Sequence, residues 1–125
     1  MNTRPRIALV AILLCLLVIV QAISAQSNVT PRLGKYNIYS YGATNRPPLF
    51  LGHVELMAGG KYRVSRTSKG PYYGEGVYEF DAASSAIQWR SGPYATAEWG
   101  GKFRVQDDTR HRIELRLRTI ATNSQ

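Results

Sequence analysis

Cysteine is almost missing from this sequence, since the only one, Cys15, lies in an apolar run near the N-terminus. The chain can therefore form no internal disulfide bond, and the residues after that run offer no thiolate as a nucleophile or metal ligand. We expect a packed hydrophobic core to stabilise the fold instead, which a domain of about 100 residues can supply.

Groups suited to catalysis are also scarce. The sequence holds two histidines, and Glu75 and Glu79, on one face of an extended strand, would lie about 13 Å apart. The carboxylates of a glycosidase lie roughly 5 to 9.5 Å apart. His53 and Glu55 could form half of a metal site, without further ligands nearby in the sequence. We therefore predict that the protein is not an enzyme and has no cofactor or metal.

Long hydrophobic runs are missing everywhere except at the N-terminus. Residues 1–6 carry two arginines and no acid, residues 7–20 are an unbroken run of 14 apolar residues, and residues 22–25 are mostly small. This order is typical of a secretory signal peptide, whereas a membrane-spanning helix needs about 20 apolar residues. We predict a signal peptide over residues 1–25, a secreted or periplasmic protein, and no membrane span in its mature form.

The mature chain is predicted to hold one small domain. Its parts are an N-terminal extension over 26–33, a single β domain over 34–120 and a tail over 121–125. Loss of two arginines with the signal leaves 14 basic and 8 acidic residues, a net charge of +6. Such a charge favours contact with polyanions or anionic surfaces without identifying one.

Sustained helical periodicity is missing after residue 26. Short alternating segments rich in Tyr, Val, Ile, Phe and Trp are separated by Gly, Pro, Asp and Ser, which is typical of strands and turns. The predicted fold class is all-β, a small antiparallel meander barrel or barrel-like sheet of seven to eight strands. Seven strands are expected over residues 35–41, 49–57, 61–66, 73–80, 86–91, 101–106 and 111–119. A closed antiparallel meander needs an even number of strands, so either residues 28–33 or part of a loop adds an eighth, or the sheet is open.

Alternation along these strands assigns their two faces, one toward the core and one toward solvent. Trp89 alternates with Gln88 and Arg90 and is expected in the core, whereas Trp99 lies between loop residues and is expected at the rim. The residues expected in the core are Tyr36, Ile38, Phe50, Val54, Leu56, Tyr62, Val64, Tyr78, Phe80, Ile87, Trp89, Phe103, Val105, Ile113, Leu115 and Leu117.

The connections between the strands alternate in length. Three are long: 42–48, 67–72 and 91–100. If every strand pairs with the next, these loops share one rim of the barrel and the short turns share the other. Exposed loops often carry function, and a mixture of aromatic and basic side chains suits a flat or anionic ligand. The predicted binding residues on this rim are Arg46, Lys69, Tyr72, Tyr94 and Trp99.

A second candidate surface is the outward-facing set of basic residues. It could bind an anionic polymer or surface, and nucleic acid is not the expected partner. Acidic residues such as Glu55, Glu79 and Glu114 share the same face, and a mixed charged exterior is ordinary for a soluble sheet. The basic residues of this set are Arg63, Arg90, Lys102, Arg104, Arg112, Arg116 and Arg118.

Two features resemble the calycins, the lipocalin-like β-barrels. Gly34-Lys35-Tyr36 opens the first expected strand, and Arg116 or Arg118 lies on the last one. Calycins have a Gly-x-Trp motif that packs against an arginine from the closing strand, and this chain has Tyr36 in place of the tryptophan. The resemblance implies a barrel whose open mouth takes a small apolar ligand. The chain also resembles small exported β proteins of bacteria, a likeness that implies no particular activity.

The expected function is binding of a small ligand or a partner protein at the long-loop rim. One alternative is a polyanion- or surface-binding module that uses the basic outer face. Another is an inhibitor that inserts a rim loop into an enzyme. A hollow interior would favour the first, salt-sensitive retention on heparin the second, and a protruding 91–100 loop the third.

Export provides a first test. We expect cleavage between about Ala22 and Gln26, after Ser24 or Ala25, because small residues at the cut suit a signal peptidase. Intact-mass measurement of the secreted product checks the position of the cut. A chain that keeps residues 1–20 in the membrane would contradict the signal peptide.

Overall fold

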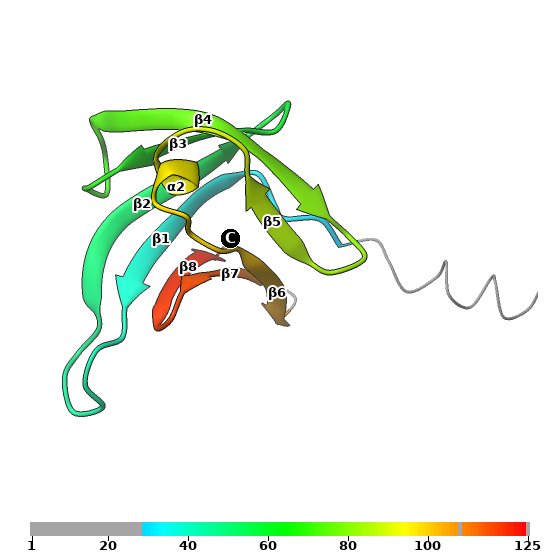
Figure 1. Ribbon diagram of the computed structural model, residues 1–125. Coiled ribbons are helices and arrows are strands. Elements are labelled where there is room, and N and C mark those ends of the chain that lie inside the picture. Colours follow the sequence, from blue (N-terminus) through cyan, green and yellow to red (C-terminus); the bar gives the residue numbers. More distant parts are fainter. Residues whose placement is uncertain (1–28, 108, 125) are drawn as a thin grey trace, which may run out of the picture.

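The chain folds into a closed antiparallel β-barrel of eight strands, in a computed structural model that describes residues 29–107 and 109–124 (Figure 1). Every strand pairs with the next one along the chain, and β8 pairs with β1. The strands are β1 (Gly34–Ser40), β2 (Leu49–Met57), β3 (Lys61–Ser65), β4 (Tyr72–Asp81), β5 (Ala86–Trp89), β6 (Lys102–Asp107), β7 (Arg110–Arg116) and β8 (Thr119–Ser124). The predicted fold class is confirmed. The predicted signal peptide lies outside the described residues, and no helix among those described is long and apolar enough to cross a membrane.

The eighth strand is β8, at the C-terminal end, rather than residues 28–33 or part of a loop. The segment expected as one strand over 111–119 ends earlier, because Leu117 and Arg118 form a two-residue turn. This turn joins β7 and β8 into a hairpin. Two-residue turns usually hold Gly, Asn or Asp, and here Arg118 adopts the left-handed conformation, with φ of 60°. The expected tail therefore belongs to β8 as far as Ser124.

The barrel interior is filled mainly by the residues that alternation predicts. Those confirmed as buried are Tyr36, Ile38, Val54, Leu56, Tyr62, Val64, Tyr78, Ile87, Trp89, Phe103, Ile113 and Leu115, and Phe80 packs against them from a half-buried position. The prediction is wrong for Phe50, Val105 and Leu117, which are exposed. Phe50 and Val105 lie next to β-bulges, which interrupt the alternation of faces, and Leu117 lies in the turn.

The long connection between β5 and β6 lies at the same end of the barrel as the other long loops, and part of it folds inward. It forms the short helix α2 (Pro93–Thr96), which packs against β4 and β5 and places Tyr94 in the core at 2% exposure. Tyr94 stacks on Trp99 and Tyr62, with ring centroids 4.6 and 5.4 Å away. Trp89 meets the Tyr94 ring edge to face at 4.9 Å. The sequence analysis did not decide whether the barrel interior is filled or hollow. Residues 91–99 fill one end of it, and we call them the plug.

Two glycines make room for the plug. At Gly76 on β4, an added Cβ would lie 2.1 Å from the Ser91 carbonyl oxygen, and at Gly92, whose φ is 87°, it would lie 2.7 Å from the Tyr62 hydroxyl. The backbone of the plug can therefore lie directly against β4. The Tyr62 hydroxyl then fixes the plug, since it donates to the Ser91 carbonyl at 2.7 Å and accepts from the Tyr94 amide at 3.1 Å.

The plug predicts a large effect of one methyl group. Gly76→Ala should lower the free energy of unfolding by about 1–3 kcal/mol, because the new Cβ pushes the plug away from β4. Gly42→Ala is the matched control, since its Cβ would meet nothing within 4 Å, and its effect should stay within about 0.5 kcal/mol. Urea denaturation measures both variants. Equal stabilities would contradict the packing of the plug.

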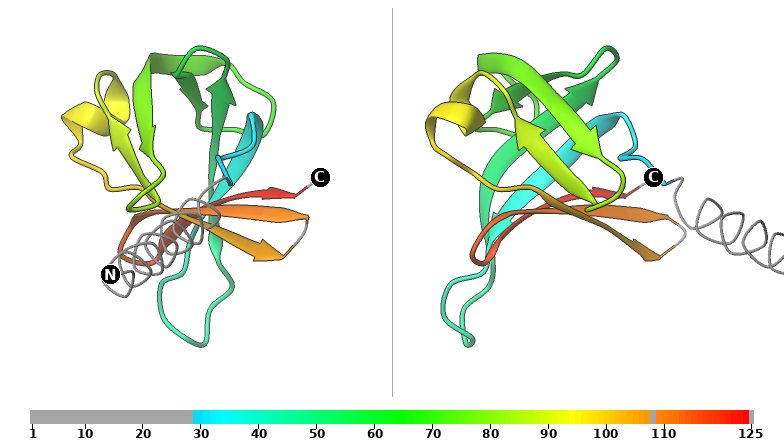
Figure 2. Two further views of the ribbon diagram at one scale, coloured as in Figure 1. Left: turned by 90° about the vertical axis from the view of Figure 1, so that its right-hand side faces the viewer. Right: turned by 45° about the vertical axis from the view of Figure 1, so that its right-hand side comes forward.

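The opposite end of the barrel is closed by the segment before β1, which lies beside β8 in Figure 2. The Arg32 guanidinium donates to the Thr109 carbonyl at 3.1 Å and to Oδ1 of Asn123 at 3.0 Å, and the Arg32 amide donates to Nδ1 of His111 at 3.1 Å. Because Nδ1 accepts, the proton of the neutral imidazole lies on Nε2. Burial, followed by the nearby charge of Arg32, holds the pKa of His111 below its ordinary value.

This lowered pKa predicts a loss of stability in mild acid. The His111 contribution is complete above pH 6.5, its ordinary pKa, and is lost as the pH falls through the folded value, because the unfolded chain binds the proton more readily. The free energy of unfolding should therefore fall as the pH drops below 6.5. Urea titrations above and below this pH should show a shallower fall for His111→Gln. An identical fall in both proteins would contradict the role of His111.

Candidate functional site

The barrel gathers its long connections at one end, as the alternation of loop lengths predicts. The connections over 41–48, 66–71 and 90–101 lie there together with the 117–118 turn, because each strand pairs with its successor. The three short turns lie at the other end (Figure 1). We call the first of these the loop end.

Four of the five predicted rim residues divide between the plug and two separate loops. Tyr94 and Trp99 stack on each other in the plug, and the Arg116 guanidinium lies 5.1 Å from the centroid of the Trp99 ring. Arg46 and Lys69 are exposed, the first in the β1–β2 loop and the second in the β3–β4 loop. Trp99, expected at the rim, is half-buried and packs against the core. That the predicted residues bind one ligand together stays a prediction.

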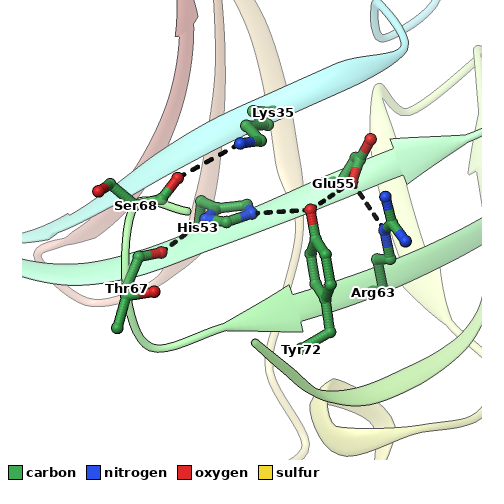
Figure 3. Close-up of polar contacts among 7 residues, drawn as sticks. All are labelled: Lys35, His53, Glu55, Arg63, Thr67, Ser68 and Tyr72. Atoms are coloured by element: carbon green, nitrogen blue, oxygen red, sulfur yellow. Dashed lines mark hydrogen bonds and ion pairs between the residues drawn. The ribbon is translucent and has the colours of Figure 1, made fainter. Parts of the chain in front are cut away.

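Tyr72, the fifth, belongs to a polar network on the outer face of β2 and β3 (Figure 3). Its hydroxyl donates to the Glu55 carboxylate at 2.8 Å and lies 3.3 Å from Nε2 of His53. Arg63 donates to the same carboxylate at 2.7 Å, and its guanidinium lies 3.9 Å from the Tyr72 ring centroid. The hydrogen bond from Arg63 holds the pKa of Glu55 below its ordinary value, and the hydrogen bond to Glu55 raises the pKa of Tyr72.

This network fastens the β3–β4 loop to the barrel. Nδ1–H of His53 donates to the Thr67 carbonyl at 2.7 Å, and the Lys35 ammonium donates to the Ser68 carbonyl at 3.3 Å (Figure 3). His53 is completely buried, so a ligand in solvent does not reach its imidazole. Within residues 29–107 and 109–124, no three His, Cys, Asp or Glu side chains are grouped to hold a metal ion. We therefore assign His53 and Glu55 a structural role.

An open groove of about 750 Å³ crosses the outer face of β7 at the loop end. Tyr41, Leu117 and Ile120 are the apolar and aromatic residues on its walls whose side chains are not buried in the core. Four cationic side chains line it, against one acidic side chain, Glu114. We call it the basic groove, and its cationic residues are Lys102, Arg112, Arg116 and Arg118.

Strand register brings these residues together. Ile113 and Leu115 point into the core, so their neighbours Arg112, Glu114 and Arg116 point outward. Pairing places Lys102 of β6 opposite Glu114. Pairing on the other side places Ile120 of β8 opposite Glu114 as well, and the Tyr41 amide donates to the Arg118 carbonyl at 2.7 Å.

Acidic residues neutralise the opposite side of the barrel more closely. Glu55 pairs with Arg63 at 2.7 Å, and Glu79 pairs with Arg90 at 2.9 Å. These short ion pairs connect neighbouring strands in the region from β2 to β5. Arg63 and Arg90 therefore already have a counter-charge in the folded protein.

Cations of the basic groove have much weaker compensation. Arg112 and Glu114 form its one ion pair among the described residues, at 3.8 Å. Nε of Arg112 is buried and has no hydrogen-bond partner there. This costs free energy, and a ligand in the open groove does not reach the atom. Arg104 lies directly opposite Arg112 on β6, and like charges in that position repel. The groove therefore has surplus positive charge.

The sequence named the cationic members of the groove but not their separation from the acidic residues. Glu55 and Glu79 share the outer surface with Arg112, yet the register places them several strands away. Ile120 was missed as a groove residue, because its place depends on the pairing of β8 with β7. A hairpin turn without Gly or Asn inside the last expected strand is the signal that could have revealed β8 and, with it, Ile120.

Surplus positive charge and flanking apolar atoms are what a site for an anionic partner requires. Comparisons with protein-family models, with curated proteins and with solved structures found no match for this chain. The functional assignment therefore depends on the chemistry of its own residues.

Proposed function

We propose that the protein is an exported binding module that captures anionic polymers or anionic surfaces in the basic groove. The observation that carries this proposal is the uneven compensation of charge on the barrel. Arg63 and Arg90 have short ion pairs, whereas the groove cations have one contact of 3.8 Å. An anion that enters the groove gains attraction without breaking a good ion pair.

Each groove residue has a distinct part in the proposal. Arg112 and Arg116 offer planar guanidinium groups, which suit the paired oxygens of phosphate, sulfate or carboxylate. Lys102 adds an exposed point charge at the start of β6. Tyr41 offers a ring for apolar parts of the ligand and a hydroxyl for a hydrogen bond. Glu114 repels anions that approach close to β7 and so limits which shapes fit.

The filled loop end argues against a small apolar ligand inside the barrel. Tyr94 occupies the core, and its neighbours Trp99 and Tyr62 stack on both sides of it. A ligand at this place would have to displace the plug, which costs the buried area of these rings. The basic groove is open and needs no such rearrangement.

Matched charge variants test the proposal. The double variant Lys102→Gln/Arg116→Gln removes two exposed cations from the groove, and Lys61→Gln/Arg90→Gln removes one lysine and one arginine, also exposed, from elsewhere on the barrel. The groove variant should bind heparin at least about tenfold more weakly than the parent chain, since each cation near an anionic surface contributes about 1 kcal/mol. Its affinity should also depend less steeply on salt.

Heparin-affinity chromatography and a salt titration measure both double variants, and their net charges are equal. The control should stay within about threefold of the parent chain, because its cations lie outside the groove. Equal weakening by both pairs would mean that heparin senses only the net charge. No retention of the parent chain at low salt would refute polyanion binding itself.

A further inference from the structure

The loop end carries exposed apolar side chains that anion binding alone does not require. Leu117, in the β7–β8 turn, is 90% exposed, and Leu49, at the start of β2, is 64% exposed. Tyr41 and Phe50 are also exposed. We call these four residues the apolar tip. Single exposed apolar residues are common, whereas a group of them marks an interaction site.

Contacts between two hairpins hold the apolar tip together. The Tyr41 amide donates to the Arg118 carbonyl at 2.7 Å, and the Arg118 side chain donates back to the Tyr41 carbonyl. Ser40 lies opposite Leu49 on one side and opposite Thr119 on the other. Figure 2 shows the β1–β2 loop and the β7–β8 turn at the same end of the barrel. The apolar tip is therefore formed by two hairpins that lie side by side, β1–β2 and β7–β8.

Positive charge surrounds the apolar tip. Arg116 and Arg118 flank Leu117 in the turn, and Arg46 is exposed in the loop that leads to Leu49. Residues 41–50 contain no acidic residue. The basic groove begins at the same place, since Leu117 and Tyr41 also line it.

We infer that the apolar tip and the basic groove together dock the protein onto an anionic phospholipid surface. The inference rests on the proposed function and names its partner. Leu117 and Leu49 enter the boundary between headgroups and acyl chains, while the arginines beside them bind lipid phosphates through their long side chains. Tyr41 suits the same interface, because its ring is apolar and its hydroxyl is polar.

Shape and charge favour a membrane over other occupants. A second copy of the chain would bring the same cations against the groove, and like charges across an interface are unfavourable. Protein interfaces have a packed core inside a polar rim, whereas Leu117 stands on a two-residue turn between two arginines. A projecting apolar residue of this kind needs a soft medium that closes around it.

Vesicle sedimentation tests the inference with the exported protein. The parent protein should bind vesicles of phosphatidylglycerol and phosphatidylcholine in equal parts, and should not bind vesicles of phosphatidylcholine alone. Leu49→Ser should weaken binding to the mixed vesicles about tenfold, because one leucine no longer enters the apolar layer. Its retention on heparin should stay unchanged, because Leu49 does not line the basic groove. Leu33→Ser, at the opposite end of the barrel, is the matched control for an exposed leucine and should leave both readouts unchanged.

The outcomes separate this inference from the proposed function. Retention on heparin without binding to the mixed vesicles would overturn membrane docking, leave the proposed function in place, and point to an acidic protein or a soluble polymer. Equal vesicle binding by Leu49→Ser and the parent protein would overturn the role of the apolar tip. Failure of the parent protein to bind heparin at low salt would overturn the proposed function itself.

Discussion

β1 and β8 pair antiparallel, with Asn37 opposite Thr122 and Ser40 opposite Thr119, and this pairing closes the barrel. An even number of antiparallel strands can close in this way. The same pairing brings Tyr41 into contact with Arg118, 77 residues further along the chain. Tyr41 belongs to both the basic groove and the apolar tip, and Arg118 belongs to the groove. Fold closure and the candidate site therefore depend on one strand pair.

Register decides which charges on the barrel surface neutralise each other. Arg63 on β3 lies opposite Glu55 on β2, and the two side chains form a structural ion pair. Arg112 faces Arg104 across β6 and β7 and has a distant contact with Glu114 on its own strand. A basic composition alone would give a diffuse positive surface. Strand pairing gathers four cations with one distant ion pair in the basic groove, and this grouping supports the binding proposed for the outside of a barrel whose interior is filled.

Alternation predicted the barrel and most of its core because it depends only on neighbouring residues. Alternation predicted one continuous strand across the Leu117–Arg118 turn, because neither residue is a typical turn former. It placed Phe50 in the core because a bulge shifts the alternation between β1 and β2. The plug could not be predicted from the sequence either. Gly76, which makes room for it, lies on β4 and is distant in the sequence from residues 91–99. For the same reason the sequence named the cations of the groove but not their grouping, which follows from register.

Chemical-shift mapping by NMR would test the central claim most directly, since every residue of a chain this small can be observed at once. A short heparin oligosaccharide would be titrated into the isotope-labelled protein at low salt. The account predicts that the largest shifts occur at Tyr41, Gly100–Lys102, Arg112 and Glu114–Arg118, which line the basic groove. Largest shifts around Arg63 and Arg90, or spread evenly over all cations, would contradict it.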